Sequence, residues 1–130
     1  MFTFEQIKAV HSKVKSGADF PRYIQDIIAL GVKKYDTFVS DGHSHFFGAD
    51  DFSTTSPAKY DMKSVAESSN GPKLIERLKF HQNGGTDYLT FCEEAASFGV
   101  EKWTVDTVKM TCTYYDKAGN TMLTEDIPQG

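Results

Sequence analysis

A segment that occurs twice constrains the fold of this chain more than any other feature of the sequence. Residues 17–35 align with residues 85–103 without a gap, at a shift of 68 positions. An internal repeat indicates that one structural unit is used twice, so it has to be recognised before single elements are assigned. The identical pairs are Gly17/Gly85, Asp19/Asp87, Gly31/Gly99, Val32/Val100 and Lys34/Lys102.

Apolar and conservative pairs add to the match within this segment and extend it on both sides. An alternative explanation is that any two helix-turn-strand units share Asp caps and Gly stops. We favour duplication because the matches fall at cap, turn and core positions. The further pairs are Ile7/Ile75, Val10/Leu78, Phe20/Tyr88, Tyr23/Phe91, Asp26/Glu94, Leu30/Phe98, Tyr35/Trp103, Phe46/Tyr114 and Phe47/Tyr115.

Each repeat predicts two helices followed by three strands, so the fold class is α+β with the order ααβββ-ααβββ. Strands linked by hairpins form an antiparallel sheet, and we expect the helix pairs to pack on one face or at the ends. The length is that of a single domain over residues 1–130. We place repeat one at about 3–57, a linker at 58–69 and repeat two at about 70–128, related by a pseudo-twofold axis.

Local signals mark the ends of the helices. Thr3 followed by Gln6 three residues later is a capping box. Asp19 is expected to cap the second helix with its side chain, and Asp87, or Thr86 beside it, the fourth. The glycines expected to end helices in the left-handed conformation are Gly31 and Gly99.

Alternation over residues 32–40 predicts a strand with two different faces. One face carries Tyr35, Thr37 and Val39, and the other carries Lys34, Asp36 and Phe38. Asp41-Gly42 then predicts a hairpin. We also expect a short edge strand within the linker, near residues 63–66. The remaining expected strands cover residues 43–48, 52–56, 100–107, 109–115 and 121–127.

Composition excludes several classes of function. The net charge of -4 and the pI of about 5.5 argue against general nucleic-acid binding, which needs Lys and Arg to neutralise phosphates. The sequence shows no secretory signal pattern and no apolar run of membrane-spanning length. Its two cysteines, Cys92 and Cys112, lack metal or redox spacing. We therefore expect a cytoplasmic protein with free thiols and no membrane partner.

His43 and His45 are the candidate metal ligands. Two positions apart on a strand, they point to one face, and Asp50 or Asp51 is a third candidate ligand. Two histidines fall short of the three or four ligands that a zinc site needs. The equivalent positions in repeat two are Thr111 and Thr113, which indicates a polar outer face. We expect no metal and no cofactor, and keep both histidines as candidate ligand-binding residues.

The cysteines and the paired acids offer weaker chemistry. Cys92 with His81 as its base would be a nucleophile. However, Cys92 occupies the place of Ile24 in repeat one, so we expect a buried and inert core residue. Cys112 likewise alternates with packed residues. The adjacent acids Asp50-Asp51 and Glu93-Glu94 do not face each other, and we interpret them as solvated surface.

Tyr35 and Trp103 occupy equivalent strand positions in the two repeats. Core packing explains large aromatic residues at such positions. The alternative is an aromatic wall of a ligand pocket between the repeats. Both residues are therefore candidate ligand-binding residues.

Several segments of the chain are similar to one family. They include the opening residues 2–21, Thr-Ser-Pro-Ala-Lys-Tyr at 55–60, Gly-Thr-Asp-Tyr-Leu-Thr-Phe-Cys at 85–92 and residues 110–120. The family consists of short uncharacterised bacterial and prophage-borne proteins, some of which carry the label "phage envelope protein". The resemblance covers essentially the whole chain and implies a bacterial, stand-alone domain. It implies no activity.

Two classes of function follow from the sequence. The first is a non-enzymatic interaction or accessory protein, acting as a homodimer through sheet edges or the seam between the repeats. The second is a small-molecule binding protein or enzyme with a pocket between the repeats. A deep pocket with convergent polar side chains would favour the second class, and a flat apolar patch the first.

Overall fold

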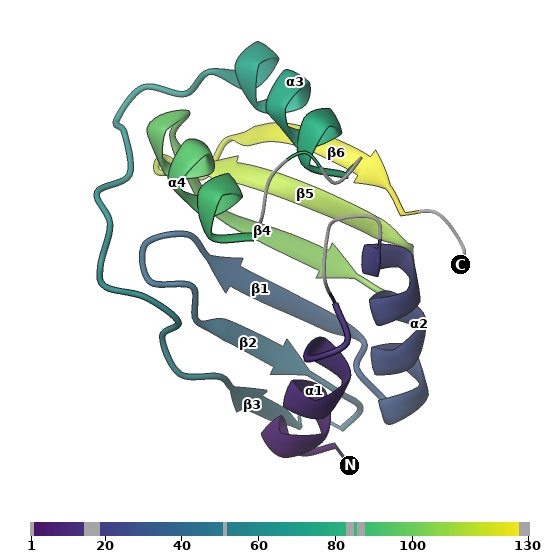
Figure 1. The fold of residues 1–130 in the computed structure, drawn as a ribbon. Coiled ribbons are helices and arrows are strands. Elements are labelled where there is room, and N and C mark those ends of the chain that lie inside the picture. Colours follow the sequence, from purple (N-terminus) through teal and green to yellow (C-terminus); the bar gives the residue numbers. More distant parts are fainter. Residues whose placement is uncertain (1, 15–18, 51, 83–84, 86–87, 128–130) are drawn as a thin grey trace.

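The computed structural model describes residues 2–14, 19–50, 52–82, 85 and 88–127. Each half of the chain contains two helices followed by three strands (Figure 1). The predicted α+β class and the predicted order of elements are confirmed. The helices are α1 (Phe4–His11), α2 (Phe20–Leu30), α3 (Gly71–Gln82) and α4 (Tyr88–Ser97). The strands are β1 (Lys34–Phe38), β2 (Ser44–Phe47), β3 (Ser53–Thr55), β4 (Val100–Asp106), β5 (Thr111–Asp116) and β6 (Thr121–Asp126).

The strands form one antiparallel sheet in the order β3-β2-β1-β4-β5-β6. Each half contributes three consecutive strands, and β1 meets β4 at the centre. The helices lie on one face of this sheet in two pairs (Figure 1). Helix α1 packs on α2, and α3 packs on α4, which also contacts β4. The architecture therefore has two layers, with a seam between the halves along β1 and β4.

The strand register agrees with the shift of 68 positions found in the sequence. At the seam, Lys34 pairs with Asp106, and the shifted counterpart of this pair is Phe38 with Lys102, which is also observed. The pair at the centre, Asp36 with Thr104, consists of two equivalent residues. This is the register that a twofold axis through the seam would produce. The symmetry itself stays a prediction, because it requires the two halves to superpose.

Burial alternates along the central strands and separates the two faces of the sheet. In β1, Tyr35 and Thr37 are buried, Lys34 is exposed and Asp36 is half-buried. The predicted division of this strand into two faces is thus confirmed. The helices cover the face of Tyr35 and Thr37, which we call the covered face, and the face of Lys34 and Asp36 is the open face.

The helix ends follow the sequence signals at three of the predicted positions. The Thr3 side chain accepts a hydrogen bond from the Gln6 N–H, and the Gln6 side chain accepts one from the Thr3 N–H. Gly31 and Gly99 have φ angles of 105° and 88°, which L-residues with a Cβ rarely adopt. The capping box and both left-handed glycines are therefore confirmed.

The predicted side-chain cap at Asp19 is wrong. Asp19 makes no side-chain capping hydrogen bond to α2, and its backbone is itself helical, with φ −86° and ψ −3°. A capping residue needs an extended backbone to turn its side chain back onto the first N–H groups of the helix. The matching cap at Thr86 or Asp87 lies outside the described residues.

The expected edge strand near residues 63–66 is also wrong, because this segment has no strand. Two isolated backbone hydrogen bonds hold it instead, from the Lys63 N–H to the Ser40 carbonyl and from the Ala66 N–H to the Ala96 carbonyl. The segment crosses the ends of the strands rather than running beside one (Figure 1). A ladder of strand hydrogen bonds requires a parallel or antiparallel neighbour, and this path offers none.

In the described part of the chain, no helix combines the length and the apolar character that crossing a membrane requires.

Candidate functional site: a cavity between the helix pairs

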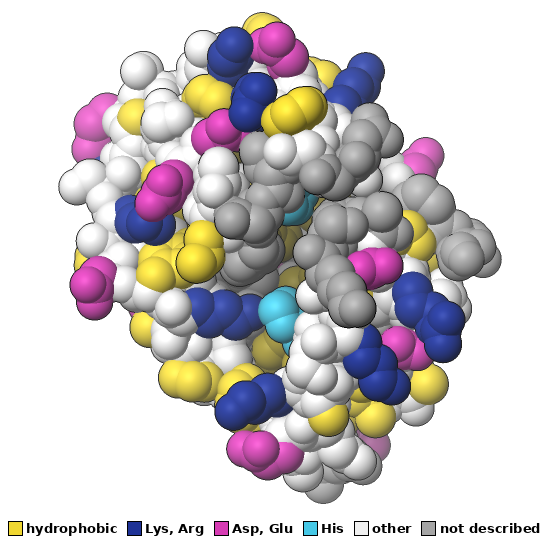
Figure 2. Space-filling view, viewed as in Figure 1, with side chains coloured by type: hydrophobic (Ala, Val, Ile, Leu, Met, Phe, Trp, Pro, Cys, Tyr) yellow, Lys and Arg dark blue, Asp and Glu magenta, His cyan; other side chains and the backbone are white. Residues whose placement is uncertain are grey.

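A cavity of about 490 Å³ lies on the covered face of the sheet. Its floor comes from strands of both halves, and its walls come from α1, α2, α3 and α4. The segment after β3 and the end of β6 complete it. Figure 2 shows a hollow near the middle of this face, with histidine and lysine side chains at its edge. The cavity therefore lies between the two halves, over the seam of the sheet.

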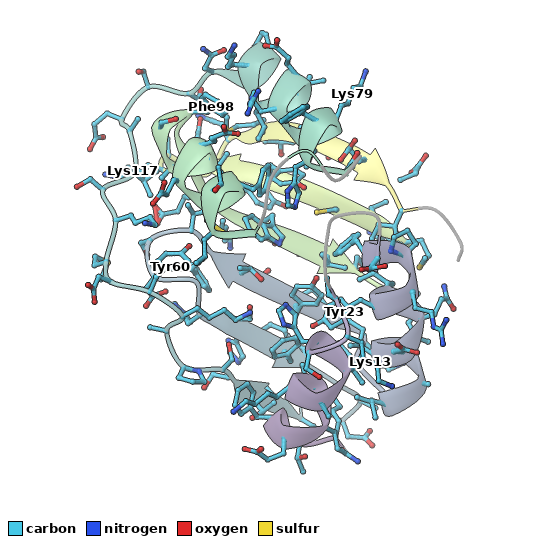
Figure 3. All side chains as sticks on the ribbon, viewed as in Figure 1. Lys13, Tyr23, Tyr60, Lys79, Phe98 and Lys117 are labelled. Atoms are coloured by element: carbon cyan, nitrogen blue, oxygen red, sulfur yellow. The ribbon has the colours of Figure 1, made fainter. Side chains whose placement is uncertain are left out.

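Two aromatic groups of three, one from each half, surround this cavity. Tyr23 points from α2 into the space between the helix pairs (Figure 3). Its ring centroid lies 6.4 Å from that of Tyr35, which lies 5.1 Å from that of Phe46. The equivalent residues of the second half are Phe91, Trp103 and Tyr114, with successive centroid distances of 6.0 Å and 6.0 Å. We call these six residues the aromatic walls.

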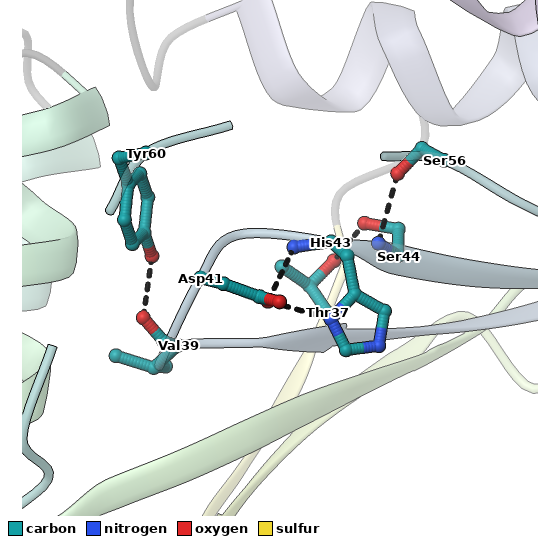
Figure 4. A network of polar contacts seen from close by, with 7 residues as sticks. All are labelled: Thr37, Val39, Asp41, His43, Ser44, Ser56 and Tyr60. Atoms are coloured by element: carbon teal, nitrogen blue, oxygen red, sulfur yellow. Dashed lines mark hydrogen bonds and ion pairs between the residues drawn. The ribbon is translucent and has the colours of Figure 1, made fainter. Parts of the chain in front are cut away.

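Three serine and threonine hydroxyl groups line the cavity in the first half (Figure 4). The Thr37 and Ser44 hydroxyl oxygens lie 2.8 Å apart, and the Ser44 N–H donates to Ser56 Oγ at 2.9 Å. All three residues are buried. We call Thr37, Ser44 and Ser56 the hydroxyl cluster. It places polar groups on a floor that is otherwise largely aromatic.

His11 and Lys59 lie near each other at the cavity. Burial of the ring and, to a smaller extent, the nearby positive charge of Lys59 together lower the pKa of His11 to about 4. Burial also lowers the pKa of Lys59, although the residue keeps an exposed surface. His11 is thus a neutral imidazole at neutral pH, beside a lysine whose charge is partly withdrawn from water.

The thiol that lines the cavity is protected against ionisation. Cys112 is 4% exposed, and burial raises its pKa to about 12, although a hydrogen bond with Tyr114 acts in the opposite direction. Cys92 is 0% exposed, which confirms its expected burial. His81 stacks on Phe91 with ring centroids 4.5 Å apart. The buried positions of the two thiols favour packing over nucleophilic catalysis.

A model of a protein family, described as "Protein of unknown function (DUF1398)", matches residues 8–126. The chain belongs to the DUF1398 family. Among the described residues, this match includes the six strands, the helices α2, α3 and α4 and the end of α1, so the aromatic walls of the DUF1398 chain lie within it. Membership agrees with the predicted resemblance to an uncharacterised family. Among curated proteins, no match was found. A bacterial or prophage origin stays a prediction.

The structure of this DUF1398 chain separates the four residues proposed from the sequence. Tyr35 and Trp103 line the cavity. His45 lies on the open face against Phe47, with ring centroids 4.2 Å apart. His43 stacks on Phe38, and its imidazole Nδ1 lies 2.5 Å from Asp41 Oδ1 (Figure 4). The binding roles of all four residues stay predictions.

The hydrogen bonds to Asp41 explain its electrostatics and the geometry of the hairpin. Burial alone would raise the pKa of Asp41, but hydrogen bonds from the His43 backbone N–H and imidazole lower it below its ordinary value. His43 is therefore engaged within the β1–β2 turn. In the part of the chain that the structure describes, no three His, Cys, Asp or Glu side chains are placed to hold a metal.

Sequence reasoning missed His11, Lys59 and the hydroxyl cluster as residues of the cavity. Ser56 and Lys59 belong to a polar stretch without periodicity, so the sequence does not indicate which way their side chains point. His11 is the last residue of α1, and its contact with Tyr23 depends on how α1 and α2 pack together, which the sequence does not indicate. One signal in the sequence could have indicated the hydroxyl cluster. At equivalent positions of the two repeats, repeat one has the polar Ser44 and repeat two has Cys112.

Proposed function

We propose that this protein binds a small organic molecule in the cavity between its helix pairs. The observation that carries the proposal is the pair of aromatic walls around a space of about 490 Å³. Small-molecule sites have volumes of about 300–1,000 Å³ and combine apolar walls with a few placed polar groups. The hydroxyl cluster and Lys59 supply such polar groups.

The pKa values of two groups in the cavity favour binding over catalysis. A general base works best when its pKa lies near the operating pH, whereas the pKa of His11 is lowered to about 4. A nucleophilic cysteine needs a depressed pKa, whereas that of Cys112 is raised to about 12. These two groups of the cavity thus suit packing and hydrogen bonding. We infer a binding protein rather than an enzyme.

Native mass spectrometry and tryptophan fluorescence test this proposal. Trp103 is the single tryptophan of the chain and lines the cavity, so a bound ligand should change its emission. We expect purified protein to carry a small molecule, and the isolated compound to alter Trp103 fluorescence when it is added back. Ala58 lines the cavity and is exposed, so a phenylalanine at this position should occupy part of the ligand's space without disturbing the core. Ala58→Phe should therefore weaken this response.

Ala118→Phe is the matched control, since Ala118 is exposed in the turn between β5 and β6. It should leave binding unchanged. The proposal fails if no compound remains bound in the native protein and a diverse library of aromatic compounds leaves Trp103 emission unchanged.

The open face carries a second candidate function, association with another copy of the chain. Phe47 and Tyr115 are half-buried on this face, and lysines lie over their rings. The Lys34 ammonium is 4.9 Å from the Phe47 ring centroid, and that of Lys102 is 5.5 Å from the Tyr115 centroid. Light scattering coupled to size exclusion tests this candidate: a dimer that Phe47→Glu dissociates supports it, and a monomer at all concentrations contradicts it.

A further inference from the structure

The polar groups of the cavity are distributed unequally between its two ends. Ser56 and Lys59 follow β3, which is one edge strand of the sheet, and Glu125 and Asp126 end β6, which is the other. All four residues line the cavity. One end therefore presents hydroxyls and a lysine, and the opposite end presents two carboxylates. The aromatic walls lie between them.

Counting donors shows what the hydroxyl cluster can offer a ligand. The contact between Thr37 and Ser44 uses one hydroxyl hydrogen, and Ser56 Oγ accepts the Ser44 N–H. Of the three O–H groups, one therefore donates within the cluster. Among the described residues, these are the hydrogen bonds that the three side chains make. Two hydroxyl hydrogens remain to be donated, and the surface that these residues share is the cavity.

Hydroxyl donors in the same cavity as a lysine suit an oxygen anion. Lys59 follows Ser56 by three residues, and both line the cavity. A hydrogen bond to a charged acceptor is stronger than one to a neutral acceptor, and partial removal of water strengthens it further. At the other end, the Glu125 carboxylate accepts a hydrogen bond from Gln82 Nε2 at 3.2 Å. Its negative charge and that of Asp126 would repel an anion there.

The second half lacks these donors at two of the equivalent positions. Val105 corresponds to Thr37, and Cys112 corresponds to Ser44. Both residues are buried, and only Cys112 of the two lines the cavity, so the second half offers no hydroxyl at either equivalent position. A symmetric pocket would not orient an asymmetric ligand. Because the two repeats carry different residues at these positions, an asymmetric ligand should bind in one orientation.

We propose that the ligand is an aromatic carboxylic acid, whose carboxylate lies against the hydroxyl cluster and Lys59 and whose rings lie between the aromatic walls. This inference rests on the proposed function and adds the chemical class and the orientation of the ligand. Stacking of a ligand ring on Trp103 is the contact that makes binding visible by fluorescence.

A set of three probes with one shape tests the proposal. Biphenyl-4-carboxylate, biphenyl-4-carboxamide and biphenyl-4-ylmethylammonium differ mainly in charge, and each can be titrated against Trp103 fluorescence and by calorimetry. We expect the carboxylate to bind about tenfold more tightly than the carboxamide, as a charge-assisted hydrogen bond predicts. The ammonium probe should bind more weakly than the carboxylate and only in the reversed orientation, because Lys59 repels it at the end where the hydroxyls lie and its charge then faces Glu125 and Asp126.

Single substitutions test which residues cause the preference for the carboxylate probe. Lys59→Met and Thr37→Val should each reduce the preference for the carboxylate several-fold, and Lys59→Arg should retain it because the charge is kept. The matched controls are Lys117→Met and Thr113→Val. Lys117 bonds to Glu67 and Thr113 contacts Thr124, both away from the cavity, so these changes should not alter the preference. Thermal unfolding checks that each variant is folded.

The outcomes separate this inference from the proposed function. If the carboxamide or the ammonium probe binds as tightly as the carboxylate, and Ala58→Phe blocks that binding, the cavity binds ligands but the carboxylate class is wrong. If the carboxylate is preferred but Lys59→Met and Thr37→Val leave the preference intact, the proposed orientation is wrong. If none of the probes binds, the ligand class is overturned, and retention of a native compound in mass spectrometry then decides the proposed function independently.

Discussion

At the scale of single residues, burial controls the chemistry of the cavity. The ring of His11 packs against Tyr23 in an edge-on contact, with centroids 5.4 Å apart. Removing water from an imidazole penalises its charged form, and Lys59 adds repulsion. The consequence is a histidine that the fold keeps neutral, so its titration is linked to stability.

The first prediction concerns the pH dependence that His11 causes. Its pKa is about 4 in the folded protein and 6.5 in the ordinary, unfolded environment. The unfolded state therefore binds more protons between these values, and linkage makes the free energy of unfolding fall as pH decreases from 6.5 to 4. Above this window the contribution is constant. Urea unfolding of the wild type and His11→Gln should show a shallower fall in the variant.

The control for this measurement is Thr113→Val on the open face, which removes no titratable group and should keep the slope of the wild type. An equal slope in the wild type and His11→Gln would contradict the linkage.

The second prediction concerns the two buried thiols. Cys92 is 0% exposed and Cys112 is 4% exposed, so a thiol reagent should label both slowly in native protein and rapidly in denaturant. Peptide mapping by mass spectrometry assigns the label to each cysteine. Rapid native labelling of Cys92 would contradict its role as a core residue and revive the nucleophile hypothesis.

At the scale of elements, the glycines after α2 and α4 show how equivalent positions differ in their surroundings. Both have positive φ, at 105° for Gly31 and 88° for Gly99. A Cβ added at Gly31 would meet its nearest neighbour, Phe2 Cδ2, at an ordinary 3.9 Å. A Cβ at Gly99 would lie 2.6 Å from the Ser68 carbonyl oxygen and 2.9 Å from Ser69 Cα. The linker thus packs directly on the turn at Gly99, which follows α4.

The third prediction follows from this contrast. Gly31→Ala should lower the free energy of unfolding by about 1–2 kcal/mol, which is the cost of a left-handed backbone for an L-residue. Gly99→Ala should lower it by about 3 kcal/mol, because steric overlap with backbone is added. Urea unfolding of both variants measures the difference. Equal losses would show that the linker moves aside at little cost.

The sequence predicted those features of the fold that depend on residues close together in the chain. The capping box at Thr3, the glycines at 31 and 99 and the alternation along β1 depend on neighbours within a few residues, and all three were predicted correctly. The cap at Asp19 failed because its backbone conformation depends on how the chain enters α2. The placement of Ser56 and Lys59 in the cavity depends on contacts across the sheet, which periodicity does not encode.

At the scale of the whole molecule, the seam between β1 and β4 joins the two halves. At its centre, Thr104 Oγ1 donates a hydrogen bond to Asp36 Oδ1 at 2.6 Å. These residues are equivalent under the shift of 68 positions and pair directly with each other. The β1–β2 and β4–β5 hairpins also share one register, since Tyr35 pairs with Phe46 and Trp103 pairs with Tyr114. Duplication would explain these relations together.

The last prediction tests the duplication with the first half alone. A fragment of residues 1–66 exposes β1 as an edge, and twofold symmetry allows two copies to rebuild the sheet by pairing β1 with β1. The seam would then place Asp36 directly opposite Asp36, and like charges at such a position are destabilising by about 0.2–1 kcal/mol. Asp36→Thr replaces this pair with two hydroxyl residues. We expect the variant fragment to dimerise roughly two- to fivefold more tightly than the unmodified one.

Analytical ultracentrifugation measures the two association constants, and Asp61→Thr is the matched control because it removes one negative charge from an exposed linker residue outside the strands. The control should leave dimerisation within error of the unmodified fragment. If Asp36→Thr has no larger effect than Asp61→Thr, the copies do not meet at β1, and the register at the seam is not the product of a twofold relation. If the effect is specific to Asp36, β1 pairs with β1 of a second copy in the same register as it pairs with β4 within one chain.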